Sequence, residues 1–142
     1  MKRLLVLVLV LVSGSAFSYD YEVYQSAKHL NDSAWNLVNR IEHKSTLSHL
    51  SGEARYLANR VSEFKSSVRY ANADWRVQRN FELVQRAFDQ LDDLLRRNRY
   101  ARHYVSVKKD VERMRDNYYR ARDVFHVSYD RAYYGRHYGY YR

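Results

Sequence analysis

The 142-residue chain contains no cysteine, no proline and only four glycines. The absence of cysteine excludes disulfides, thiol nucleophiles, zinc–thiolate sites and covalent haem attachment. Proline and glycine are the residues that most often interrupt regular structure, so their scarcity favours long helices with short connections. The composition therefore predicts an all-α protein that is stabilised by packing alone.

Several motifs of catalysis are also missing from the sequence. There is no H-E-x-x-H, no G-x-S-x-G and no glycine-rich phosphate loop, and no E-x-x-H pair of the kind that di-iron bundles use. We therefore expect a non-enzymatic protein with no catalytic residues and no cofactor. An enzyme whose site is not visible in the sequence is the third-ranked interpretation.

The longest uninterrupted apolar run, residues 4–12, lies near the N-terminus. It follows Lys2 and Arg3 and precedes small residues, including Ala16 and Ser18, which is the pattern of a secretory signal peptide. Its nine residues are far fewer than the roughly 20 that a membrane-spanning helix needs. The pattern predicts that residues 1–18 are a signal peptide cleaved after Ser18, or after Ala16 as second choice. The mature protein would then be periplasmic or secreted and have no transmembrane segment.

A sustained spacing of three and four residues between apolar positions organises the rest of the chain. The repeat continues from Tyr104 to Ala132, and similar repeats occupy residues 19–42, 47–71 and 77–95. Ser45 or Thr46 is the expected N-cap of the second helix. Four helices with three short turns predict an up-down-up-down four-helix bundle over residues 19–132. The alternative is a three-helix bundle with a loosely attached N-terminal helix.

The predicted core comes from the apolar positions of the last three helices. Its members are Leu57, Val61, Phe64, Phe81, Val84, Phe88, Val111, Met114, Tyr118 and Phe125.

Charge is divided unevenly along the chain. Residues 19–95 carry ten basic and eleven acidic side chains, whereas residues 96–142 carry thirteen basic and five acidic ones. Residues 133–142 form a predicted flexible tail rich in tyrosine, arginine and glycine. Arginine and tyrosine together can meet an anionic group and stack on a ring. The residues predicted to bind a polyanion or partner are Lys108, Arg115, Arg122, Arg131, Arg136, Arg142, Tyr134, Tyr138 and Tyr141.

The leading functional hypothesis is an exported interaction module of the cell envelope that acts through this C-terminal region. Its partner would be an envelope protein or an anionic envelope polymer, and nucleic acid is a further candidate. The second hypothesis is a metal-binding bundle. The predicted topology places His43, His49 and His103 at one end of the bundle, where three imidazoles would suit zinc or copper.

Overall fold

A computed structural model describes residues 4–70 and 74–138, with side chains described for residues 21–69 and 75–130. Within these ranges the chain is helical and contains no strand. The elements are α1 (Leu4–Glu42), the 3-10 helix η1 (Ser45–Leu50), α2 (Ser51–Tyr70), α3 (Asp74–Arg97), the short α4 (Arg99–His103) and α5 (Val105–Tyr138). The prediction of an all-α helical bundle is confirmed.

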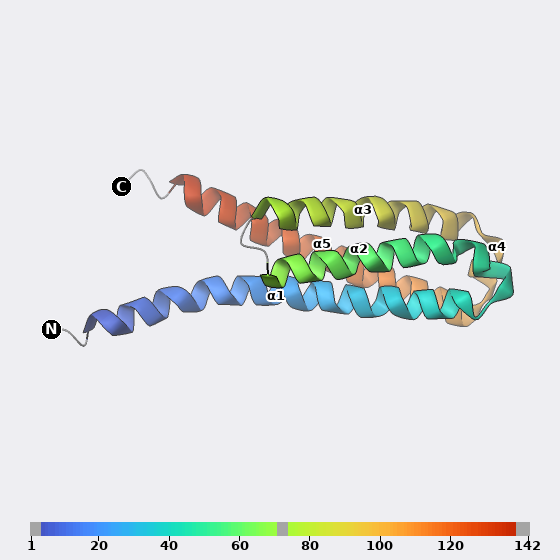
Figure 1. The fold of residues 1–142 in the computed structure, drawn as a ribbon, viewed down its shortest axis with the longest axis horizontal. Coiled ribbons are helices and arrows are strands. Elements are labelled where there is room, and N and C mark those ends of the chain that lie inside the picture. Colours follow the sequence, from blue (N-terminus) through green and yellow to red (C-terminus); the bar gives the residue numbers. More distant parts are fainter. Residues whose placement is uncertain (1–3, 71–73, 139–142) are drawn as a thin grey trace.

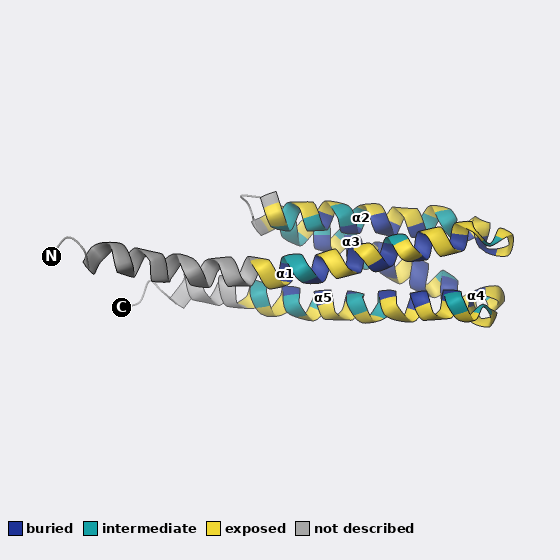
Figure 2. Ribbon diagram, turned by 90° about the horizontal axis from the view of Figure 1, so that it is seen from below, coloured by how far each residue is buried: buried dark blue, intermediate teal, exposed yellow. Residues whose placement is uncertain are grey.

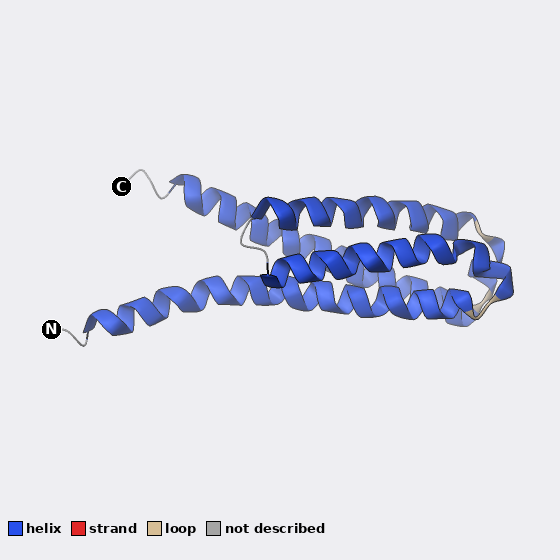
Figure 3. Ribbon diagram, viewed as in Figure 1, coloured by secondary structure: helices blue, strands red, loops and turns tan. Residues whose placement is uncertain are grey.

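The long helices α1, α2, α3 and α5 run in alternating directions along one axis (Figure 1). α2 packs against both α1 and α3, and α5 returns along the free side of α1. In the described part of the chain, short connections join α1 to η1, α3 to α4 and α4 to α5 (Figure 3). The η1 turn and α4 meet at one end of the bundle, where Thr46 Oγ1 lies 3.2 Å from the Tyr104 hydroxyl. The first and third turns therefore lie at the same end of the bundle.

The core is a continuous apolar layer between the long helices (Figure 2). All ten residues predicted for the core from the last three helices are at most 5% exposed. α1 is one unbroken helix and contributes its own buried face, which includes Leu30, Leu37 and Ile41. The N-terminal helix is therefore an integral part of the bundle, and the alternative with a loosely attached helix is not observed.

The four seams of the bundle differ in width. α1 buries small side chains (Ser26, Ala27, Ser33 and Ala34) and its backbone lies close to those of α2 and α5. In the described part of the chain, α3 and α5 do not approach one another as closely, and rings fill the space between them. Phe88 stacks on Tyr118 at 3.6 Å between ring centroids, and Phe81 lies 4.4 Å from Phe125.

The turns differ in detail from the expectation. Lys44 occupies the N-cap position of η1 and makes no side-chain cap, so the proposed cap at Ser45 or Thr46 is wrong. Both residues lie inside the 3-10 helix, whose hydroxyls bond backward: Ser48 donates to the Ser45 carbonyl at 2.8 Å. These hydroxyls donate to carbonyls, so they do not replace an N-cap, which has to accept a hydrogen bond from a free backbone amide.

The start of α1 and the end of α5 fall within the two terminal segments predicted from the sequence, the signal peptide of residues 1–18 and the flexible tail of residues 133–142. α1 begins at Leu4 and thus includes most of the predicted signal peptide, whose side chains lie outside the described residues. α5 ends at Tyr138, inside the range predicted as a tail, and residues 139–142 lie outside the described chain. Among the helices that the structure describes, none combines the length and apolarity required to cross a membrane.

Candidate functional site

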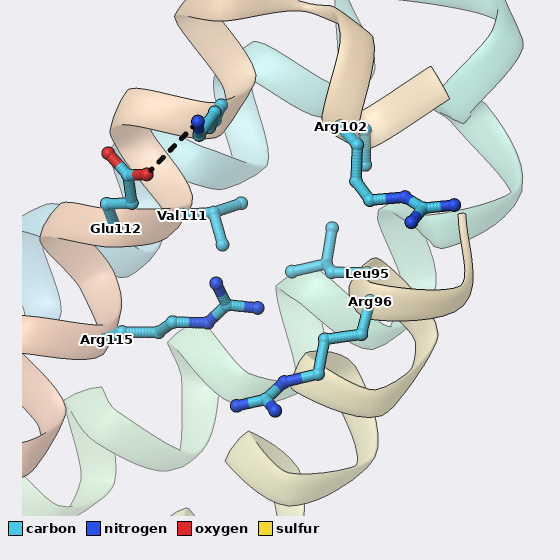
Figure 4. A pocket seen from close by; sticks show the side chains of 8 residues that line it. Leu95, Arg96, Arg102, Val111, Glu112 and Arg115 are labelled. Carbon is cyan, nitrogen blue, oxygen red and sulfur yellow. Dashed lines mark ion pairs between the residues drawn. The ribbon is translucent and has the colours of Figure 1, made fainter. Parts of the chain in front are cut away.

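A cleft of about 470 Å³ lies where the end of α3, the short α4 and the first turns of α5 meet. Four cationic side chains line it: Arg96 from α3, Arg102 from α4, and Lys108 and Arg115 from α5 (Figure 4). Three separate elements therefore contribute positive charge to one hollow. We call this hollow the basic cleft.

The floor of the basic cleft is apolar. Leu95, Ala101 and Val111 form it, and each is at most 5% exposed because the same side chains also belong to the core. A floor anchored in the core holds the surrounding backbone in place. The long aliphatic stems of the arginine and lysine side chains cover apolar surface while their charged groups stay at the rim.

Asp92 anchors two of the four cations. Its side chain is only 9% exposed and accepts hydrogen bonds from Arg96 Nε at 2.8 Å and from Arg115 Nε at 2.5 Å. Each arginine makes this bond through Nε and not through its two terminal guanidinium nitrogens. Charge-assisted bonds to a buried acceptor restrict the rotamers of both arginines. Asp92 therefore preorganises the cationic wall of the cleft.

The basic cleft also contains one exposed carboxylate. Glu112 lines it from α5, and its Oε1 lies 3.8 Å from Lys108 Nζ. That distance is longer than a hydrogen bond, so the ion pair is loose. The cleft thus has two different sides, which Figure 4 shows: the Lys108–Glu112 pair on one, and Arg96 and Arg102 on the other.

The turn between α3 and α5 brings these groups together. Asn98 ends α3 with an extended backbone (ψ 115°), and its Oδ1 accepts a hydrogen bond from the Ala101 amide at 3.0 Å. This is an N-cap, which starts α4 immediately after α3 stops. Tyr104 is extended again before α5 begins. The change of direction at Asn98 places Arg102 on the same side of the cleft as Arg96, and the change at Tyr104 turns the chain into α5.

The structure divides the predicted binding residues into separate groups. Lys108 and Arg115 lie in the basic cleft, whereas Arg122 is apart from it, 3.0 Å from Asp123 and above the Tyr119 ring. The side chains predicted further along lie outside the described ones: Arg131, Tyr134, Arg136, Tyr138, Tyr141 and Arg142. At 1.5 Å per residue, the α5 backbone places positions 108 and 136 about 40 Å apart. The predicted residues of the basic cleft and those near the C-terminal end of α5 therefore belong to two separate regions of the chain and not to one cluster.

Arg96 and Arg102 were not among the site residues predicted from the sequence. Basic residues near a helix C-terminus are common because they complement the helix dipole, so they do not stand out as binding residues. The signal that would have identified them is their placement on either side of Asn98, a residue type that frequently caps a helix.

The three histidines of the metal hypothesis do not form a centre. His43 Nδ1 lies 2.6 Å from the Asn39 carbonyl within its own helix, and His49 Nε2 lies 3.1 Å from Asn98 Nδ2. In the part of the chain that the structure describes, no three histidine, aspartate, glutamate or cysteine side chains are grouped to hold a metal ion. His103 belongs to α4 and is not among the contacts of the other two.

A second cleft of about 440 Å³ lies on the opposite side of α5 and is lined by Arg40, His43, Asp110 and Arg113 among others. Its central polar feature is an ion pair between Arg40 Nε and buried Asp110 at 2.8 Å. Here Asp110 offsets one of only two arginines, Arg40 and Arg113. The basic cleft has four cations against two carboxylates, Glu112 and the buried Asp92. The basic cleft is therefore the stronger candidate.

No family model, curated protein or solved structure matches the chain.

Proposed function

We propose that the protein is an exported, non-enzymatic helical module that binds an anionic polymer of the cell envelope, with the basic cleft as its principal docking point. The observation that carries the proposal is the convergence of Arg96, Arg102, Lys108 and Arg115 on one hollow. The predicted signal peptide supports the location. The C-terminal end of α5 would supply a second, weaker contact.

The electrostatics of the cleft support an anionic ligand. Four cations and one carboxylate line the hollow, and the other nearby carboxylate, Asp92, is buried and occupied by two of the arginines. Exposed charges act over about 8–10 Å at physiological salt, so affinity should follow this local cluster and not the charge of the whole chain. Arginine suits the role because its guanidinium can hold phosphate or carboxylate with two parallel hydrogen bonds.

The sequence provides a matched pair of double variants to test this site. Arg102→Gln with Lys108→Gln removes two cations from the cleft, whereas Arg99→Gln with Lys109→Gln removes two exposed cations from the same two helices outside it. Both variants have the same net charge. We expect the cleft variant to elute from immobilised lipopolysaccharide or heparin at clearly lower salt than the control variant does.

Salt dependence gives a second readout. Each contact between a cation and a polymer phosphate releases a counterion, so losing two contacts should reduce the slope of log affinity against log salt by roughly two. Equal weakening by both double variants would show that only net charge matters and would remove the cleft from the proposal. Truncation after Ala132 tests the second contact, and we expect it to weaken retention less than the cleft variant does.

A further inference from the structure

We propose that the basic cleft recognises an anionic sugar unit, meaning a phosphate or carboxylate attached to a ring that carries free hydroxyls, in preference to a bare anion. This inference rests on the proposed function and specifies the chemistry of its ligand. Glu112 is the residue that would give the cleft its preference for a ligand with hydroxyl groups.

The two sides of the cleft favour different chemical groups of a ligand. Arg96 and Arg102 lie opposite the Lys108–Glu112 pair, and the guanidinium group of Arg115 lies between them (Figure 4). An anionic group is attracted to the arginines and repelled by the Glu112 carboxylate, so it settles at the arginine side. A uniformly charged chain would have to place a second anion beside Glu112.

Glu112 has unfilled capacity to accept hydrogen bonds. Its side chain is 55% exposed, and Lys108 Nζ at 3.8 Å is too distant to donate a short hydrogen bond. A carboxylate accepts only, and its two oxygens offer about four lone-pair directions. Ligand groups that satisfy it without repulsion are neutral donors, and hydroxyls are the neutral donors that sugars carry in abundance.

The size and floor of the cleft agree with a ligand larger than a single ion. About 470 Å³ is within the range of sites that bind small molecules and is more than one phosphate or carboxylate group requires. Leu95 and Val111 are at most 5% exposed, so the apolar surface open to the carbon face of a ring comes mainly from the aliphatic stems of the arginine and lysine side chains above this floor. The anionic group at the arginines and hydroxyls at Glu112 then fix the orientation of that ring.

The test is a set of NMR titrations of the full mature chain with inorganic phosphate, glucose 6-phosphate and glucose. We expect the hexose phosphate to bind about tenfold or more tightly than phosphate, because hydrogen bonds to a charged acceptor are the strong ones. Glucose alone should bind too weakly to measure. Glu112→Gln should reduce the preference for the hexose phosphate to about threefold or less. The control Asp116→Asn removes the same charge from an exposed position on α5 outside the cleft and should preserve the preference.

Several results would overturn the inference. One is a parent protein that binds phosphate and hexose phosphate alike while remaining salt-sensitive on the polymer, in which case the proposed function stands and the sugar specificity falls. Another is a Glu112→Gln variant that binds every anion more tightly, because Glu112 would then be only a repulsive charge. Absence of any salt-sensitive binding would overturn both proposals. A phosphorylated oligosaccharide distinguishes the sources: tighter binding than the monosaccharide indicates a polymer unit, and equal binding indicates a free sugar phosphate.

Discussion

Phe81→Ala should destabilise the bundle more than almost any other single truncation. Phe81 of α3 is 1% exposed and lies between two other rings, with centroids 5.1 Å from Phe64 of α2 and 4.4 Å from Phe125 of α5. Those two rings are themselves 5.8 Å apart in an edge-to-face arrangement. Phe81 therefore joins three helices at one point, in the seam where the α3 and α5 backbones lie less close to one another than α1 lies to α2 and α5.

The expected loss of stability is about 3–5 kcal/mol. That range covers the lost transfer free energy of a buried phenyl ring and the cavity that remains. We expect the upper part of the range, because two aromatic contacts of roughly 0.5–1.5 kcal/mol each disappear with the ring and widely spaced backbones cannot close over the space. Domains of this size have only about 5–15 kcal/mol of stability to lose. At about 3–6 °C per kcal/mol, the melting temperature should fall by roughly 10–30 °C.

Thermal and urea unfolding followed by far-ultraviolet circular dichroism measure this change. Phe81→Leu keeps most of the apolar volume and should cost clearly less than alanine does. Tyr100→Ala, at a position 52% exposed, is the surface control and should change stability by no more than about 0.5 kcal/mol. If Phe81→Ala melts within a degree or two of the parent, the aromatic seam does not hold the bundle together and our assignment of the core is wrong.

Three further predictions concern the buried acid, the buried tyrosine and the N-terminus. Asp92→Asn should lower the free energy of unfolding, measured in urea, by about 2–4 kcal/mol, because it leaves half-buried Arg115 unpaired. The control Asp93→Asn breaks an exposed ion pair with Arg97 and should lower it by less than about 1 kcal/mol. Equal losses in the two variants would contradict the anchoring role of Asp92. Burial raises the pKa of Tyr118 to about 12. The unfolded chain therefore ionises this hydroxyl first, and between pH 10 and pH 12 the parent should lose stability relative to Tyr118→Phe by about 1.4 kcal/mol per pH unit; a difference that does not change with pH refutes this. Mass spectrometry of the exported protein should find Tyr19, or Phe17 as second choice, at the N-terminus, and an intact Met1 in a membrane fraction would contradict the signal-peptide prediction.

The sequence predicted the fold well because helical periodicity is a local property. Phe81, Val84 and Phe88 fall at spacings of three and four, and such positions share one face of a helix whatever it packs against. The turns were harder to predict because their hydrogen bonds compete at similar energies. At the first turn the chain forms a 3-10 helix that already includes Ser45 and Thr46, so neither residue takes the expected cap position.

The basic cleft was only partly predictable, for a different physical reason. Lys108 and Arg115 were predicted because they belong to the basic C-terminal region, and their spacing of seven residues places them on one side of a helix. Arg96 and Arg102 reach the same hollow only because Asn98 caps α4 and redirects the chain. Asp92 was invisible for a related reason: a buried carboxylate resembles any surface acid in a sequence until its two arginine partners are placed in space.

The unequal seams of the bundle have a consequence for which substitutions the chain can accept. Where α1 lies close to α2 and α5, its buried Ala27 and Ser33 leave no space for a larger side chain, so enlargement is the damaging change there. Where rings hold α3 and α5 apart, the damaging change is the opposite one, loss of volume. In related sequences, the buried positions of α1 should therefore vary among alanine, serine and glycine. The positions between α3 and α5 should vary among phenylalanine, tyrosine and leucine, and residues of one set should rarely replace those of the other.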